Sequence, residues 1–493
     1  MAASCIKDMT YFSVVLFSYP RLSRLNLFKK YICNINRYST AVTVKKHQTT
    51  MDENVDTNSS TFVHRKHPGI LKCRNVQLPV SLQESITVLL AKYPVHELKD
   101  QTQFLVNYLA SRKRPVEDTE LRKHAIKPEN EFATNSNSDY IPDRPKDIKK
   151  RKTIVMNKLK RSIYHWQTIT YNEMVSVAYL MGRFAANYAA IYRAFNEIKQ
   201  REPDFFPEAI LDFGSGLCTS VWAAEATWDN KVKEYMCIDI SKHMHAVADA
   251  LLRDGDENRE RTVQNVFQRH FIPLSPQQNY NIAISAFSLL DLPTKSERIS
   301  TVRRLWKKTD DFMVIIENGS REGFKTVNEA RDLILGLAKP LGKDKEGDIE
   351  NGYVFAPCQH DLSCPKTTST KENIEPCNCV QEYKPIKESK VKSNSLRERF
   401  SYVILRKGAR QNRADGHWPR LVEPVIQRSR HVICNLCCAN GQLQRPVITK
   451  TKHGKDLYRC TRHSNQGDLL PISHPDTLTD PPSEGEGQEF TGQ

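Results

Sequence analysis

The sequence predicts an α/β fold: a doubly wound, mostly parallel sheet with a helical region before it and a small basic β-rich extension after it. Segments with strand-like and helix-like patterns alternate between residues 208 and 337, as βαβ units do. Two strand-like segments, 281–287 and 312–316, have the apolar character of strands buried on both faces. Another, 208–213, runs into a Gly-rich turn that opens a helix-like segment, an arrangement that suits nucleotide binding.

The N-terminal segment has the composition of a mitochondrial import signal. The first 50 residues hold eight Lys or Arg and one acid, Asp8. Its apolar stretch is short, and basic residues continue beyond it, unlike in a secretory signal. We therefore predict a transit peptide over residues 1–45, a matrix location, and a flexible segment over residues 46–78.

A helical region is predicted over residues 79–200. Helical spacing of apolar residues in 81–109 predicts two helices, separated at Pro94. A polar linker, 112–145, follows. The basic stretch 146–161 is either a helix that tracks phosphates or a solvated helix face. The segment 171–199 is apolar on most sides, which predicts a long buried helix.

The sheet domain is predicted over residues 201–408. Its expected strands are 208–213, 234–239, 280–287, 311–318, 352–357 and 400–407, and its expected helices are 219–228, 243–254, 296–307 and 327–337.

The Gly-rich turn carries the predicted cofactor-binding residues. Asp212, Gly214, Ser215 and Gly216 form the turn, and Asp239 ends the next strand, where an acid can accept hydrogen bonds from a ribose. An ordinary βαβ turn without a ligand is the alternative. Asp-x-Gly-x-Gly followed by this acid resembles class I S-adenosylmethionine-dependent methyltransferases, which implies a Rossmann-like sheet and that cofactor.

Two departures from the methyltransferase pattern favour cofactor binding over methyl transfer. Cys218 stands where many members have a third glycine, and its side chain could crowd the cofactor. The segment 285–291, Ser-Ala-Phe-Ser-Leu-Leu-Asp, lacks the motif of amino-group methyltransferases and the cysteine of cytosine-C5 methyltransferases.

The C-terminal region concentrates the positive charge of the chain. The net charge is +16, and residues 391–474 hold 16 Lys or Arg against five acids. This excess favours an anionic partner, nucleic acid first, although solubility alone could explain it. We predict a basic, Cys-containing extension over 409–474 and a disordered acidic tail over 475–493. No apolar run is long enough for a transmembrane helix, so no membrane insertion is expected.

Eight of the thirteen cysteines follow residue 350, which favours metal binding behind an import signal. With the motifs 211–216, 285–289, 317–319, 354–358, 434–438 and 456–460 in this order, the chain resembles the mitochondrial small-ribosomal-subunit assembly family that includes methyltransferase-like protein 17. The resemblance implies a methyltransferase-like fold, a [4Fe–4S] cluster, and action on the small subunit at its ribosomal RNA.

The ligands implied for the cluster come from the Pro-rich insert 357–380 and from the extension. They are Cys358, Cys364 and Cys377, which match family positions, and Cys437, chosen from a crowded trio. The alternates are Cys379, Cys434 and Cys438. A zinc ribbon built from Cys434, Cys437, Cys460 and His463 also has suitable spacing.

The sequence leaves two main functions open. One is an assembly factor that binds ribosomal RNA, acts as a monomer on the ribosome precursor and supports mitochondrial translation. The other is an active S-adenosylmethionine-dependent ribosomal RNA methyltransferase. A sensor that gates assembly through its cluster is compatible with the first. No catalytic residue is predicted.

Overall fold

The computed structural model describes residues 50–56, 62–115, 169–256, 258–273, 275, 278–337, 351–367, 375–387 and 394–473. The predicted transit peptide, the basic stretch 146–161, most of the linker 112–145 and the acidic tail 475–493 lie outside these residues. None of the described helices has the length and apolar character needed to cross a membrane.

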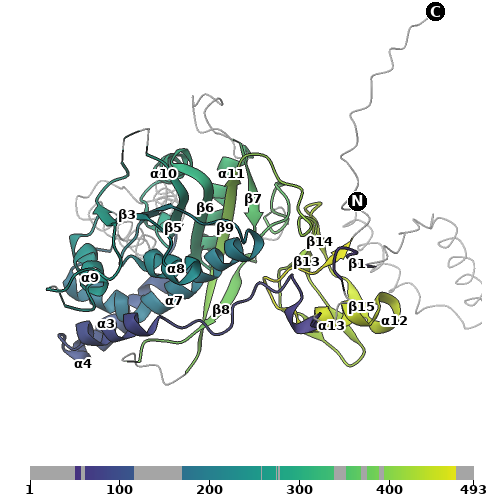
Figure 1. Cartoon of the computed structure of the whole chain (residues 1–493), viewed down its shortest axis with the longest axis horizontal. Coiled ribbons are helices and arrows are strands. Elements are labelled where there is room, and N and C mark those ends of the chain that lie inside the picture. Colours follow the sequence, from purple (N-terminus) through teal and green to yellow (C-terminus); the bar gives the residue numbers. More distant parts are fainter. Residues whose placement is uncertain are drawn as a thin grey trace, which may run out of the picture. The chain divides into compact units, whose positions relative to one another are not determined.

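The centre of the described structure is one eight-stranded sheet (Figure 1). Five strands are parallel, and their order reverses between β2 and β5; β9 then runs antiparallel to β6 and β7. In sheet order the strands are β4 (Val266–Arg269), β3 (Glu234–Ile238), β2 (Ala209–Phe213), β5 (Tyr280–Ala286), β6 (Thr309–Asn318), β9 (Leu396–Lys407) and β7 (Gly352–Ala356), with β8 (Cys379–Tyr383) also paired to β9. This is the predicted doubly wound, methyltransferase-like α/β sheet.

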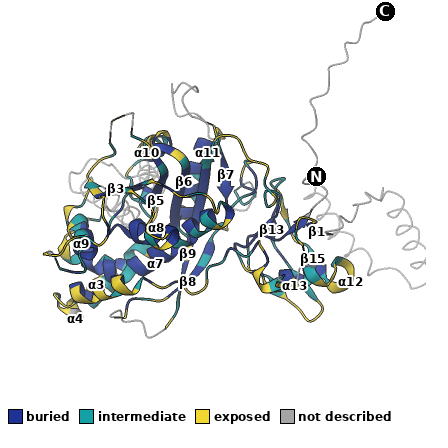
Figure 2. Cartoon of the chain, in the orientation of Figure 1, coloured by how far each residue is buried: buried dark blue, intermediate teal, exposed yellow. Residues whose placement is uncertain are grey.

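Helices cover both faces of the sheet. Alternate residues of each central strand enter two separate apolar cores, as Val314 and Met313 do on β6. Central strands are accordingly buried on both sides (Figure 2). The first core contains α3 (Val80–Leu90), α4 (Val95–Ala110), α7 (Glu173–Arg201), α8 (Thr219–Trp228) and α9 (Lys242–Leu252); the second contains α10 (Lys295–Lys307) and α11 (Arg321–Ile334).

Several elements of this domain differ from the sequence prediction, and β9 begins four residues before the predicted start at 400. Strands β4 and β8 were not predicted because they are short and half-exposed, with burial in alternation rather than in an apolar run. Helix α11 begins six residues earlier than predicted, at Arg321. The Ser320 side chain accepts a hydrogen bond from the Gly323 amide and caps this first, polar turn.

The extension contains two three-stranded sheets and two helices. The helices were not predicted; α13 buries Leu457, Cys460 and Thr461 on one side. Strands β14 and β15 are separated at Pro446, which lacks an amide hydrogen. The elements are β10 (Arg420–Leu421), β11 (Ile426–Gln427), β12 (His431–Ile433), β13 (Leu436–Cys437), β14 (Leu443–Gln444), β15 (Val447–Thr449), α12 (Lys450–His453) and α13 (Lys455–His463).

Most of the segment that we expected to be flexible, residues 46–78, is packed where the structure describes it. Strand β1 (Thr50–Met51) pairs with β16 (Ile472–Ser473). The Asp52 carboxylate, 2% exposed, accepts hydrogen bonds from His417 and Trp418. Val76 forms a bridge with Tyr383 at the end of β8. The segment has no periodic pattern because its partners are distant residues.

A buried ion pair joins the extension to the sheet domain. Glu197 of α7 is fully buried, and its Oε1 lies 2.7 Å from Nη2 of Arg420 in β10. Tyr402 of β9 donates to Glu197 Oε2 at 2.7 Å. Arg420 also donates to the carbonyls of Pro357 and Gly467, at 2.8 and 2.7 Å. One residue of the extension is thereby tied to a helix and to the beginning of the Cys-rich insert.

Candidate functional sites

The Gly-rich turn lies where the strand order reverses, the usual ligand crevice of such sheets. Gly214 and Gly216 adopt φ of +71° and +50°, which a side chain would disfavour. The amides of Gly214 and Ser215 both donate to the Ile238 carbonyl, at 2.8 and 2.9 Å. Space above Gly216 is open, since no atom lies within 4 Å of a Cβ built there.

The two acids of the predicted cofactor site differ in their surroundings. Asp239 is half-buried; its Oδ2 accepts from the Gly216 amide at 2.9 Å and its Oδ1 from the Ser241 amide at 2.8 Å. Asp212 is buried and accepts a hydrogen bond from Ser220. Asp239 therefore lies beside the open space at Gly216. Asp212 is buried beneath the turn, where its hydrogen bond with Ser220 holds the turn to helix α8.

Asp212 should make stability depend on pH. Burial raises its pKa to about 7, against the Ser220 hydrogen bond and with help from the Asp239 charge. The folded state holds this proton after the unfolded state has lost it, so stability falls by about 1 kcal/mol per pH unit between about pH 4 and 7. We expect Asp212→Asn to remove this slope, because the amide stays neutral and still accepts from Ser220. Urea titrations of both proteins across this range, with Asp310→Asn as an exposed control, provide the measurement; equal slopes would contradict the assignment.

Sequence reasoning missed several residues beside this turn. Arg112, two residues after the end of α4, lies 2.7 Å from the Asp291 carboxylate in η3 (Leu289–Asp291). Burial raises the pKa of Asp291 to about 6, against the Arg112 charge. Tyr171 and Tyr179 pack edge to face, 5.8 Å between ring centroids. Burial raises the pKa of both hydroxyls, and the charges of Asp239 and Asp291 raise it further. The end of the segment 285–291 therefore contacts a side chain that is far away in sequence.

The four implied cluster ligands are neighbours in the folded chain. Cys364 and Cys437 are buried, and Cys358 and Cys377 are half-buried. A hydrogen bond from Cys437 lowers the pKa of the Cys358 thiol to about 5, against burial. Burial raises the pKa of Cys377, and the nearby thiolates of Cys358 and Cys364 raise it further. The insert and β13 thus bring together four sulfurs from residues 79 positions apart in sequence.

The surroundings of these four cysteines suit an anionic occupant. Arg331 and Arg420, both 3% exposed at the side chain, help to lower the Cys358 pKa. The charge of Lys366, whose side chain is 10% exposed, lowers the pKa of the Cys377 thiol. A thiolate-bound iron–sulfur cluster carries net negative charge, which buried cations would compensate. Four thiols and this charge therefore fit a [4Fe–4S] cluster in donor type and number.

The alternate cysteines have different surroundings, although Cys379 is close enough to Cys377 for its charge to raise the Cys377 pKa. Cys434 and Cys438 are in the apolar core of the extension with Leu457 and Leu470. Cys379 faces Gly467, whose added Cβ would meet its sulfur at 3.1 Å. Across the described residues, no three His, Cys, Asp or Glu side chains are arranged to hold a single metal ion. Neither the residues of the alternative zinc ribbon nor the four cysteines of the implied cluster form a preformed site for a single ion among the described residues.

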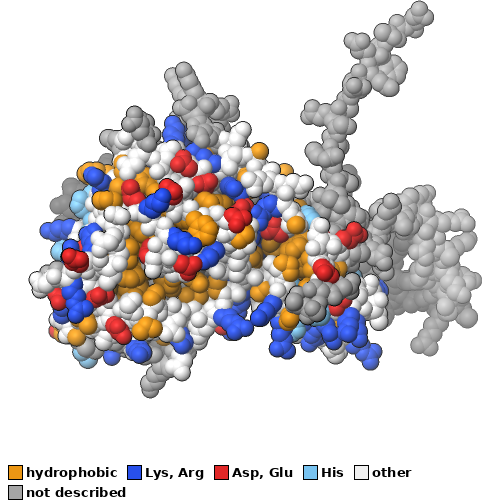
Figure 3. Space-filling model, viewed as in Figure 1, with side chains coloured by type: hydrophobic (Ala, Val, Ile, Leu, Met, Phe, Trp, Pro, Cys, Tyr) orange, Lys and Arg blue, Asp and Glu red, His pale blue; other side chains and the backbone are white. Residues whose placement is uncertain are grey.

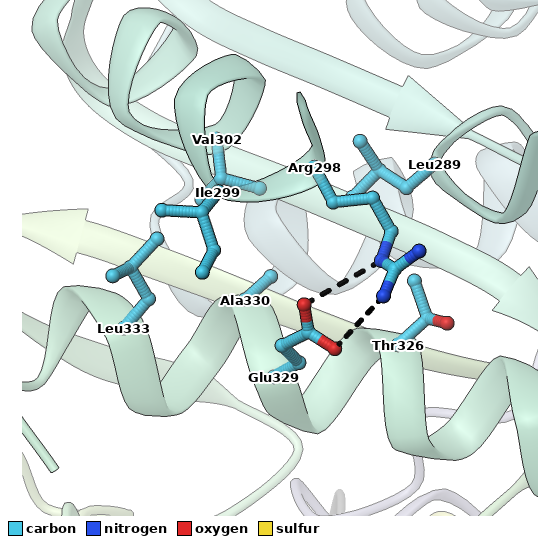
Figure 4. Close-up of a pocket in the computed structure, with 8 residues that line it drawn as sticks. All are labelled: Leu289, Arg298, Ile299, Val302, Thr326, Glu329, Ala330 and Leu333. Carbon is cyan, nitrogen blue, oxygen red and sulfur yellow. Dashed lines mark hydrogen bonds and ion pairs between the residues drawn. The ribbon is translucent and has the colours of Figure 1, made fainter. Parts of the chain in front are cut away.

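A small pocket between α10 and α11 belongs to neither predicted site (Figure 4). Its charged residues are Arg298 and Glu329, whose Nε and Oε1 lie 3.4 Å apart. The close-up shows these two side chains pointing toward each other. The remaining lining is mainly aliphatic, from η3 and the two helices. We interpret the pocket as a packing gap beside the ion pair that joins the two helices.

Comparison with known proteins identifies the family. Residues 173–471 match the model of the mitochondrial small ribosomal subunit Rsm22 family, which is more than half of the 493 residues. The chain belongs to the Rsm22 family. This Rsm22-family protein is 41% identical over 432 residues to the human ribosome assembly protein METTL17, mitochondrial, covering 86% of this chain and 90% of the relative. It is 21% identical to the ribosome assembly protein RSM22, mitochondrial, of Saccharomyces cerevisiae, covering 59% and 66%.

The Rsm22-family chain also resembles solved structures of methyltransferases, with low TM-scores. A putative class I S-adenosylmethionine-dependent methyltransferase from Listeria monocytogenes has a TM-score of 0.29 and 12% identity, covering 68% of this chain and 90% of that chain. A putative RNA methyltransferase from Pyrococcus horikoshii has a TM-score of 0.27 and 10% identity, covering 45% and 83%. The fold assignment rests on the strand order itself.

Proposed function

We propose that this protein is an assembly factor for the small subunit of the mitochondrial ribosome, located in the matrix, that binds ribosomal RNA during maturation and supports mitochondrial translation. One observation carries the assembly role: the identity to a protein named for ribosome assembly extends over nearly all of both chains. The RNA-binding role is supported by the charge of the extension.

The proposed RNA-binding surface, here called the basic face, is formed by the extension and a nearby 3-10 turn. Figure 3 shows Lys and Arg gathered over α12 and α13. Within the described residues, its exposed side chains have no carboxylate partner in an ion pair, so their charge is available to phosphates. They are Arg65, Lys66, Arg428, Arg430, Lys450, Lys452, Lys455 and Arg459.

Charge reversal on the basic face is expected to weaken RNA binding steeply. The triple variant Arg428→Glu, Arg430→Glu, Lys452→Glu removes three proposed phosphate contacts. The slope of log affinity against log salt should fall in magnitude by about 2, and affinity at low salt by at least about tenfold. Filter binding with small-subunit ribosomal RNA fragments across a salt series measures both.

A second triple variant controls for net charge alone. Lys233→Glu, Arg304→Glu and Lys384→Glu change the charge equally at exposed positions of the sheet domain. This protein should bind RNA nearly as the wild type does. Equal losses in the two triples would show that the basic face has no special role.

We further propose that Cys358, Cys364, Cys377 and Cys437 hold a [4Fe–4S] cluster. The mutual proximity of these thiols and the buried cations around them support the proposal. Bound there, the cluster would join the insert of the sheet domain to β13 of the extension. Its binding energy would add to the stability of the junction that carries the basic face.

The alternative function is S-adenosylmethionine-dependent methylation of the same RNA. The open space above Gly216 and the position of Asp239 favour binding of the cofactor. Asp239→Asn removes one carboxylate acceptor, so calorimetry should show S-adenosylmethionine affinity reduced about tenfold or more. Asp256→Asn, at a side chain that is 47% exposed, is the control. If Asp239→Asn lost cofactor binding yet restored translation in depleted cells, methyl transfer would be dispensable.

A further inference from the structure

His360 lies against the four-cysteine group and has no role in the ligand set. Its side chain is 3% exposed, and its Nε2 is 3.4 Å from the sulfur of Cys437. Its Nδ1 is buried and has no hydrogen-bond partner among the described residues. The contact with Cys437 is the one hydrogen bond of this ring to a side chain among the described residues, and the Leu362 backbone acts on the ring as well.

Arg331 holds the loop that carries His360. From α11, its Nη2 donates to the carbonyls of His360, at 3.4 Å, and Leu362. Its Nη1 pairs with Asp332 at 2.7 Å. The guanidinium thus fixes the turn from 360 to 362 and places a buried positive charge near Cys358 and Cys364.

The chemistry of a metal-bound sulfur fixes the direction of the His360 contact. A ligating thiolate has lost its proton, so it can accept a hydrogen bond but cannot donate one. The His360 ring can donate this hydrogen bond to the thiolate in the tautomer that carries the proton on Nε2. Hydrogen bonds to cluster sulfurs stabilise the more negative, reduced form and so raise the reduction potential.

We propose that His360 is a positioning residue that donates a hydrogen bond from Nε2 to the Cys437 sulfur in the loaded centre, and that Arg331, by fixing its loop, maintains this bond and the reduction potential that it sets. The inference rests on the cluster proposed above. It adds a determinant of the cluster's one-electron chemistry that lies outside the four cysteines.

A matched pair of substitutions separates hydrogen bonding from packing. His360→Leu fills similar volume without a donor, whereas His360→Gln keeps an N–H that can reach the sulfur. His96→Leu, at a position 93% exposed at the side chain, is the control. Each full-length protein is purified without oxygen, assayed for iron and sulfide, and titrated with dithionite while the reduced cluster is followed by electron paramagnetic resonance.

The wild type and His96→Leu should share one midpoint potential. His360→Leu should keep its iron, but its reduced-to-oxidised ratio at that potential should be about tenfold lower, a shift of about 59 mV to more negative values. His360→Gln should lie between them. Loss of iron from His360→Leu with retention in His360→Gln would also support the proposed donor.

Two outcomes would overturn the inference. One is a normal iron content and an unchanged potential in His360→Leu, which would leave the proposed cluster intact. The other is equal iron loss from both His360 variants, because the donor would then make no difference. Wild-type protein free of iron and sulfide would instead refute the cluster proposal itself.

Discussion

Replacing Arg420 with methionine is expected to lower the free energy of unfolding by about 3–5 kcal/mol, because it leaves the Glu197 carboxylate buried without its closest cation. The substitution also leaves the carbonyls of Pro357 and Gly467 without this donor. Urea unfolding followed by circular dichroism gives the size of the loss. Hydrogen exchange should show faster opening of β10 and of the loop after Pro357.

A double variant tests whether the uncompensated charge is the cause. Glu197→Leu with Arg420→Met replaces the pair by apolar groups, so most of the lost stability should return. Arg201 lies 3.6 Å from the same carboxylate and limits the recovery, since its own charge remains buried. If the double variant were as unstable as the sum of the two single variants, lost packing would explain the effect better than charge.

Replacing Cys437 with serine is expected to abolish most iron and sulfide binding, because serine is a poor ligand for the cluster. Cys437 is the only proposed ligand from the extension, so its loss should also loosen β13 from the insert. Cys434→Ser is the matched control: it changes an equally buried cysteine three residues away that lies in an apolar core. Metal analysis and hydrogen exchange of residues 358–364 and 436–444 measure the two effects.

The Cys434→Ser control distinguishes the loss of a cluster ligand from the loss of a buried core cysteine. Cys434→Ser should cost stability, since it places a hydroxyl in an apolar setting, yet it should retain iron. Retention of iron in Cys437→Ser together with its loss in Cys434→Ser would reverse the ligand assignment.

The sequence was informative where local patterns decide structure. The apolar segments at β5 and β6 and the Gly-rich turn after β2 predicted the core of the sheet and the turn at the end of its first parallel strand. Strands β4 and β8 were not predicted because they are short and half-buried, and they form by pairing with the neighbouring strands β3 and β9. Helix α13 was missed because its apolar side has few residues, among many charges.

Long-range partners could not be predicted from spacing. Arg112 pairs with Asp291 across 179 positions, and nothing in the sequence around Arg112 points to this partner. Among the crowded cysteines 434, 437 and 438, strand alternation decides which sulfur faces the insert, and a two-residue strand is too short to read from sequence. His360 carried no signal beyond its place two residues after Cys358.

Metal analysis of the wild-type protein tests the central claim most directly. The full chain is purified without oxygen, and iron, acid-labile sulfide and zinc are determined per chain. We predict iron and sulfide in equal amounts, about four of each, with the absorption of a [4Fe–4S] cluster and little zinc. One zinc per chain without iron, or no metal at all, would contradict the account.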